Sequence, residues 1–182
     1  MSEALNGLTP LWQQHSLDLP DYPFRFGALG QSERLIGTAA RSVRLNSAPP
    51  ALILRSGEVV FISATAREPL AAWADRNGLG QITLRDTWSL LCAPFLDTHY
   101  PPEHARHDIE TLRLRNFTPT EVTAIQARIA PALLAYNALL QDWTVLGHYD
   151  LLLAWREHGP GLDAEFYVWS MEIALRGWGD KL

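Results

Sequence analysis

The sequence predicts an α+β fold, in which a β-hairpin or small antiparallel sheet near the N-terminus packs against a predominantly helical C-terminal half. Two patterns predict this class. β-Branched and aromatic residues flank Ser56-Gly57, which indicates a hairpin over residues 51–65. From residue 86 onwards, apolar residues recur at spacings of three and four, which is typical of helices. Both kinds of element in separate stretches of one chain favour α+β over the other classes.

A chain of 182 residues has the length of one globular domain, and we expect a single domain over residues 1–182. Prolines and glycines are frequent in residues 1–30, which predicts an irregular arm. Residues 31–66 should be rich in β-structure, with a possible strand in 33–46 before the hairpin. Residues 67–182 should be mainly helical.

The helical part has several clear boundaries. Residues 67–78 should form a helix that ends at Asn77-Gly78. Asp86 is a good N-cap for the next helix, and Pro94 should end or kink it. Pro102 can then open a helix that runs to about residue 116.

Residues 118–143 have the best helix start in the chain. Thr118 at the cap, Pro119 at the first position and Glu121 three residues after the cap form a capping box. The apolar residues that follow, from Val122 to Trp143, lie on one face. Pro131 should bend this helix.

Residues 149–176 fit two structures. Alternating apolar residues in 166–175 are typical of a half-buried strand, so the segment could form a long hairpin. Good helix formers in 170–176, followed by Gly177, favour two helices separated by residues 159–161. We predict two helices.

Histidines and carboxylates are concentrated in residues 95–110. On a helix that begins at residue 102, His104 and Asp108 lie four residues apart on one flank, beside a buried side formed by Ala105, Ile109 and Leu112. Imidazole and carboxylate groups suit a divalent transition metal, which would support a metal-dependent hydrolase. The candidate ligands are Asp97, His99, His104 and Asp108, with His107 as an outer candidate. The alternative interpretation is a solvated helix face, because neither HExxH nor CxxC occurs.

The main functional prediction is a non-enzymatic protein-binding or regulatory domain that uses an aromatic-rich C-terminal surface. No phosphate-binding, nucleophile-elbow or dinucleotide-binding motif occurs, so we expect no cofactor and lean against an enzyme. Tyr167, Trp169 and Trp178 are the candidate interface residues, because surplus Trp and Tyr anchor protein interfaces. The expected partner is a second copy of the chain or another protein.

Charge is unevenly distributed along the chain, whose net charge is −5. The segment from Tyr22 to Gly57 is rich in arginine, and Arg41 and Arg44 are candidate anion-binding residues. The competing interpretation is that these arginines pair with carboxylates of the acidic second half. Overall acidity argues against binding to nucleic acid.

The N-terminus has neither a basic start nor an apolar run, so we expect no signal peptide and no membrane partner. The one cysteine, Cys92, cannot form an intramolecular disulfide, and its apolar neighbours predict a buried thiol. These observations predict a cytoplasmic protein.

Overall fold

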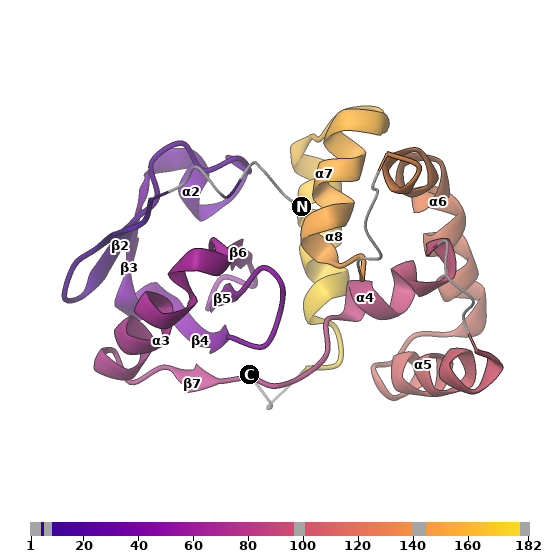
Figure 1. Cartoon of the computed structure of the whole chain (residues 1–182), viewed down its shortest axis with the longest axis horizontal. Coiled ribbons are helices and arrows are strands. Elements are labelled where there is room, and N and C mark those ends of the chain that lie inside the picture. Colours follow the sequence, from indigo (N-terminus) through magenta and orange to yellow (C-terminus); the bar gives the residue numbers. More distant parts are fainter. Residues whose placement is uncertain (1–4, 6–8, 97–100, 140–144, 179–182) are drawn as a thin grey trace. The chain divides into compact units, whose positions relative to one another are not determined.

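The computed structural model describes residues 5, 9–96, 101–139 and 145–178 (Figure 1). The chain divides into two compact units, an N-terminal unit that ends at Leu84 and a helical unit that begins at Arg85. Strands occur in the N-terminal unit, and helices dominate the C-terminal half. The predicted α+β class is therefore confirmed, whereas the single domain over residues 1–182 stays a prediction.

The N-terminal unit contains two small sheets. The first is antiparallel with the order β1-β2-β3, formed by β1 (Leu11–Trp12), β2 (Ser16–Asp18) and β3 (Arg34–Ile36). The second has the order β6-β5-β4-β7, formed by β4 (Ala40–Arg44), β5 (Ala51–Leu54), β6 (Val59–Phe61) and β7 (Gly80–Gln81). The pairing of β7 with β4 is parallel, and the other pairs are antiparallel.

The predicted hairpin is confirmed as β5 and β6. Leu52 pairs with Val60, and the turn between the strands contains Gly57 at a φ of +85°, a conformation that glycine adopts without a steric cost. All seven residues of the two strands are buried. The strands thus form part of the core of the N-terminal unit.

The first thirty residues differ from the predicted irregular arm, because they contain β1, β2 and most of a short helix, α2 (Ala28–Gln31). Leu17 of β2 pairs with Leu35 of β3. Beside this pair, the Asp18 carboxylate accepts two hydrogen bonds from the Arg34 guanidinium, at 2.6 and 2.8 Å. The strand β2 therefore pairs both with the adjacent β1 and with β3, which follows at a distance in the sequence.

The helix α3 (Arg67–Arg76) ends as predicted, with Asn77 at its C-cap and Gly78 at a φ of +65°. It lies along β4 in the N-terminal unit (Figure 1). The Trp73 indole N–H donates to the Gln13 carbonyl at 3.1 Å, which ties α3 to the loop between β1 and β2. Since α3 and β7 belong to this unit, the unit extends to Leu84.

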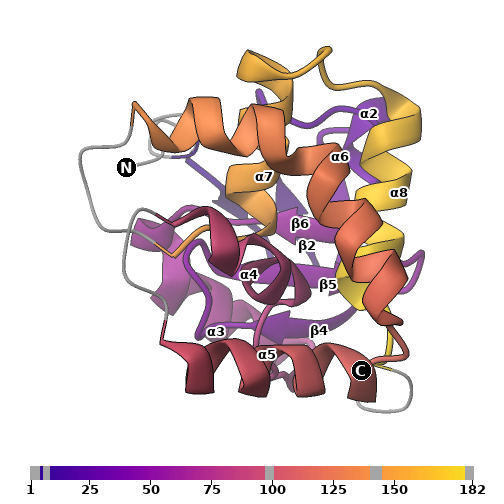
Figure 2. The ribbon, with the colours of Figure 1, turned by 90° about the vertical axis from the view of Figure 1, so that its right-hand side faces the viewer.

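The helical unit contains five α-helices in its described residues and one short 3-10 helix (Figure 2). The predicted pair of helices at the end of the chain is confirmed, with a break that contains Gly161 at a φ of +100°. The elements are α4 (Thr87–Cys92), η3 (Ala93–Phe95), α5 (Pro102–Leu114), α6 (Pro119–Asn137), α7 (His148–His158) and α8 (Ala164–Leu175).

The longest helix, α6, supplies much of the core of the helical unit. Ile125, Ile129 and Leu133 are buried, as the apolar spacing predicts, and α6 packs against both α4 and α7. Pro131 lies inside α6 and has no backbone N–H to donate. Figure 2 shows that α6 changes direction along its length. Among the described residues, no helix has the length and apolar content needed to cross a membrane.

Candidate functional site

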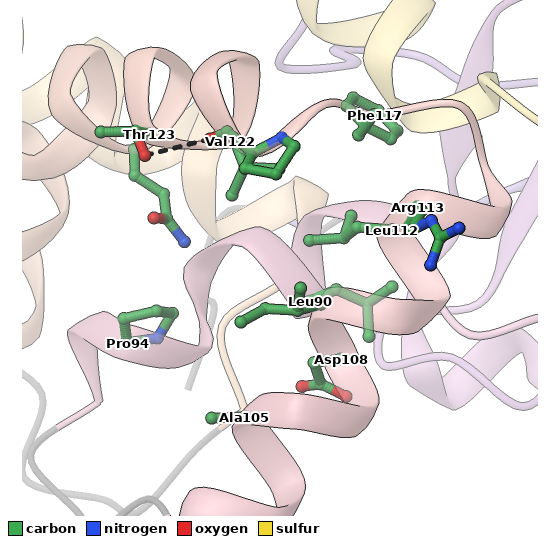
Figure 3. A pocket seen from close by; sticks show the side chains of 12 residues that line it. Leu90, Pro94, Ala105, Asp108, Leu112, Arg113, Phe117, Val122 and Thr123 are labelled. Atoms are coloured by element: carbon green, nitrogen blue, oxygen red, sulfur yellow. Dashed lines mark hydrogen bonds between the residues drawn. The ribbon is translucent and has the colours of Figure 1, made fainter.

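The helical unit contains a pocket of about 270 Å³ between α4, α5 and α6 (Figure 3). We call it the α5–α6 pocket. Its wall is largely apolar, and it includes side chains from all three helices and from the α5–α6 turn. The lining residues are Leu90, Pro94, Ala105, Asp108, Ile109, Leu112, Arg113, Phe117, Pro119, Val122, Thr123 and Gln126.

A tight turn between α5 and α6 determines the shape of one end of this pocket. Asn116 has a φ of +64°, its N–H donates to the Arg113 carbonyl at 2.9 Å, and the N–H of Phe117 donates to the Leu112 carbonyl at 3.1 Å. This is the Schellman arrangement that ends a helix. Thr118 then caps α6 by accepting a hydrogen bond from the Glu121 N–H at 3.2 Å, as the sequence predicts. The buried ring of Phe117 is held between the two helix ends.

Two arginines connect α5 to the segment that precedes α4. Arg85 forms an ion pair with the buried carboxylate of Asp108, with 2.5 Å between Nη1 and Oδ1. Arg115, at the end of α5, donates to the Thr87 hydroxyl at 2.7 Å and to the Arg85 carbonyl at 2.8 Å. Since Asp108 and Arg115 are buried, these contacts compensate for their removal from water and hold α5 in a defined position beside α4.

The four polar side chains on the pocket wall are all engaged within the chain. Asp108 pairs with Arg85, and the Thr123 hydroxyl donates to the Pro119 carbonyl at 3.0 Å, which Figure 3 marks as a dashed line. The Gln126 amide donates to the Leu91 carbonyl at 3.2 Å. Arg113 lies 3.5 Å from a Glu110 carboxylate oxygen in an exposed pair, which is the weakest of these contacts.

The predicted metal cluster is only partly within the described residues. Asp97 and His99 lie outside them, so the structure does not place these two candidates. His104 and His107 are exposed on α5, whereas Asp108 is buried. In the described part of the chain, no three His, Cys, Asp or Glu residues come together as a metal-binding group.

The buried face of α5 is rotated from the predicted one. Ile109 was expected to be buried and Asp108 to lie at the edge of the core, yet Ile109 is 58% exposed and Asp108 only 4% exposed. The ion pair with Arg85 explains the difference, because burying a carboxylate that is paired with a guanidinium costs less free energy than burying an unpaired one.

The structure places the three candidate interface residues differently from one another. Tyr167 and Trp178 are buried, at 2% and 1% exposure, and are part of the core of the helical unit. Trp169 is half-buried and is the remaining candidate of the three. The aromatic surface expected from the sequence is thus reduced, because Trp73, Trp88 and Trp178 are all accommodated in the interior.

The two candidate anion-binding arginines, Arg41 and Arg44, differ in their exposure to solvent. Both belong to β4 in the N-terminal unit, but Arg44 is 3% exposed and Arg41 is partly exposed. The β4–β5 register shifts between Ala40 and Ser42, next to Arg41. The structure therefore does not present the two guanidinium groups equally to solvent.

A second polar cluster joins α4, α7 and α8 inside the helical unit. The Asp86 carboxylate caps α4 through the Trp88 N–H at 3.1 Å and also accepts from the His148 N–H at 2.9 Å. His148 Nε2 lies 2.9 Å from the Ser170 hydroxyl, which donates to the Tyr167 carbonyl at 2.8 Å. A serine beside a histidine is the arrangement of a nucleophile and its base. Here both side chains are fully buried, so the pair connects helices and does not reach a substrate.

The thiol of Cys92 is buried in α4, as predicted. Burial raises the pKa of this thiol well above its usual value, and the carboxylates of Asp86 and Asp150 add to the rise. A thiol with a raised pKa carries little of the thiolate that acts as a nucleophile. Cys92 is therefore a core residue.

The α5–α6 pocket is not predicted by the sequence. Its apolar wall combines residues that periodicity assigns to helix cores, such as Leu90 and Leu112, with partly or largely exposed ones such as Val122 and Ile109. The sequence contains no separate signal for it, because Ile109 belongs to the apolar stripe that periodicity assigns to the core. No protein-family model matches the chain, and no curated protein or solved structure matches it.

Proposed function

We propose that this protein is a non-enzymatic protein-binding domain, and that the α5–α6 pocket holds an apolar side chain of a partner protein. The main observation behind the proposal is that each of the four polar residues on the pocket wall already forms a hydrogen bond or an ion pair within the chain. A catalytic site requires polar groups that can contact the substrate. A pocket that selects an apolar group requires an apolar wall whose shape is complementary to that group.

The size of the pocket supports a side chain as the occupant. Its volume of about 270 Å³ is close to the lower limit of the range of about 300–1,000 Å³ that is usual for small-molecule sites. Ile109 and Pro94 are exposed at its edge, so the apolar surface continues outside the pocket. A partner protein would cover this surface as well as the pocket. An apolar anchor surrounded by polar residues such as Arg113 is also the usual organisation of a protein interface.

The binding surface that we propose lies on α5 and α6 and not on the aromatic residues near the end of the chain, since Tyr167 and Trp178 are buried. We propose a partner that presents an apolar residue on an amphipathic segment, the mode in which helices bind grooves. The location that we propose is the cytoplasm, where a lone thiol such as that of Cys92 stays reduced.

The experiment is a titration of methyl-labelled protein with N-acetyl-leucine amide and N-acetyl-phenylalanine amide, followed by NMR. We expect the methyl signals of Leu90, Leu112 and Val122 to shift, while those of Leu133 in the core stay unchanged. Ala105→Leu, which adds carbon atoms on the pocket wall, should abolish the shifts. Ala124→Leu is the matched control, because Ala124 is exposed and does not line the pocket.

Absence of saturable shifts at the pocket methyls would contradict the proposal, as would shifts that persist in Ala105→Leu. Sedimentation equilibrium separates the two kinds of partner. A mass of two chains that falls to one chain in Ala105→Leu would identify the occupant as a second copy of this protein. A mass of one chain in both the wild type and Ala105→Leu would indicate that the partner is a different protein.

A further inference from the structure

Three aromatic rings form a platform on the surface formed by α7 and α8. Trp155 and Phe166 are stacked, with ring centroids 3.9 Å apart and an angle of 7° between their planes. Trp169 lies beside them, with its centroid 5.1 Å from that of Phe166. Trp155 and Phe166 are buried and Trp169 is half-buried, so Trp169 is the ring of this platform that solvent reaches.

Arg128 of α6 lies over this platform. Its guanidinium carbon is 4.1 Å from the ring centroid of Trp169, 5.4 Å from that of Phe166 and 5.9 Å from that of Trp155. These distances are within the range of cation–π attraction. The contact holds an otherwise flexible side chain in one place, although Arg128 is an exposed residue.

Arg128 differs from the other arginines that lie over rings. Arg115 lies over Trp178 but also donates to Thr87 and to the Arg85 carbonyl. Arg176 lies over Phe117 and is ion-paired with Glu121. In the part of the chain that the structure describes, no hydrogen bond or ion pair is formed by Arg128. Its N–H groups therefore remain available to an acceptor from outside.

We propose that Arg128 is a carboxylate-binding site, which recognises an Asp or Glu side chain of an acidic segment in a partner protein. The cation–π contact uses the charge of the guanidinium and none of its N–H donors, so two of these donors can form parallel hydrogen bonds to a carboxylate. Because the rings already restrict the side chain, less conformational entropy is lost when the carboxylate binds.

The charges around the platform favour a carboxylate over a phosphate. One guanidinium balances one negative charge, whereas a phosphate group carries about −1.5 to −2 at neutral pH. Glu165 and Glu172 are exposed on α8, one turn before and one turn after Trp169. They would repel the additional charge of a phosphate more strongly than that of a carboxylate. The site is independent of the proposed function, since none of its residues lines the α5–α6 pocket.

The test is an NMR titration of the Arg128 Nε–H and Trp169 indole N–H signals. The probes are three blocked tripeptides, acetyl-Gly-X-Gly-amide, in which X is glutamate, glutamine or phosphoserine. We expect saturable shifts with the glutamate peptide and affinity at least about fivefold lower for the glutamine peptide, because a charge-assisted pair is stronger than a neutral one.

Variants separate recognition of the planar carboxylate from simple attraction between charges. Arg128→Gln should abolish the shift of the Trp169 indole, and Arg128→Lys, which keeps the charge but not the fork, should weaken binding at least about fivefold. Arg106→Gln is the matched control, because Arg106 is exposed on α5 and lies over none of these rings; it should bind as the wild type does.

Several outcomes would overturn the proposal. Equal affinities for the glutamate and glutamine peptides would exclude carboxylate recognition, and absence of a saturable shift would do the same. Wild-type affinity in Arg128→Lys would show that only a point charge is needed. Tighter binding of the phosphoserine peptide than of the glutamate peptide would replace the carboxylate with a phosphate as the ligand.

Discussion

The carboxyl group of Asp150 should make the stability of the helical unit depend on pH. Its Oδ2 accepts a hydrogen bond from the Gly147 N–H at 2.9 Å, at the start of α7. Burial raises the pKa of Asp150 from 3.8 to about 6, the Gly147 hydrogen bond opposes this rise, and the charge of Asp86 adds to it. The folded protein therefore keeps a proton on Asp150 at pH values where the unfolded chain has released it.

The sign of the effect follows from this difference. Because the pKa is higher in the folded state, the contribution to stability is fully present below the unfolded pKa of 3.8 and is lost as the pH rises through about 6. A rise from 3.8 to about 6 corresponds to about 3 kcal/mol, at about 1.36 kcal/mol per pKa unit. This figure is an upper bound, since the side chain keeps some contact with solvent.

Asp150→Asn isolates the contribution, because asparagine can still accept the Gly147 N–H but cannot ionise. Urea unfolding of both proteins between about pH 4 and about pH 8 gives the difference in the free energy of unfolding. We expect the variant to match the wild type at the acidic end and to exceed its stability by up to about 3 kcal/mol at the basic end. Asp163→Asn, at the N-cap of α8 and exposed, is the matched control and should show no such gain with pH. A difference that is constant across the range, or that is largest at acidic pH, would refute the reasoning.

Two further predictions concern the core and the metal alternative. Ile129→Ala should lower the free energy of unfolding by about 2–5 kcal/mol in urea denaturation, because Ile129 is completely buried in α6. Leu134→Ala, at an exposed position of the same helix, should have little effect, and equal losses would show that the wrong face has been assigned. Protein purified without an affinity tag should contain no stoichiometric transition metal in elemental analysis. Bound metal that is lost in His104→Ala would instead favour the metal-dependent hydrolase.

Elements that depend on local signals could be predicted from the sequence. The Ser56-Gly57 hairpin, the Asp86 and Thr118 caps and the end of α3 at Asn77 all depend on residues within a few positions of one another. The strand β2 could not be predicted in this way. Residues 13–15, which connect it to β1, include no Gly, Pro, Asn or Asp that would mark a turn, and its other partner, β3, begins sixteen residues after β2 ends.

The candidate site could be predicted less well than the fold. The sequence indicates the α5 and α6 helices, but the pocket depends on how α5 is rotated, and that rotation follows from the burial of Asp108 against Arg85. A periodicity argument places Asp108 at the edge of the core and cannot include a partner that lies 23 residues away in the sequence. In the same way, the number of tryptophans suggests an aromatic surface, yet it does not specify that Trp178 is buried.

The most direct test of the central claim is a selection of peptides from a random display library on the immobilised wild-type protein. Each selected peptide is then measured against Ala105→Leu and against Ala124→Leu by fluorescence anisotropy. Binding to the α5–α6 pocket predicts that the selected peptides share an apolar anchor residue, lose most of their affinity for Ala105→Leu, and bind Ala124→Leu as tightly as the wild type. Peptides that bind all three proteins equally would contradict the claim that this pocket is the binding surface.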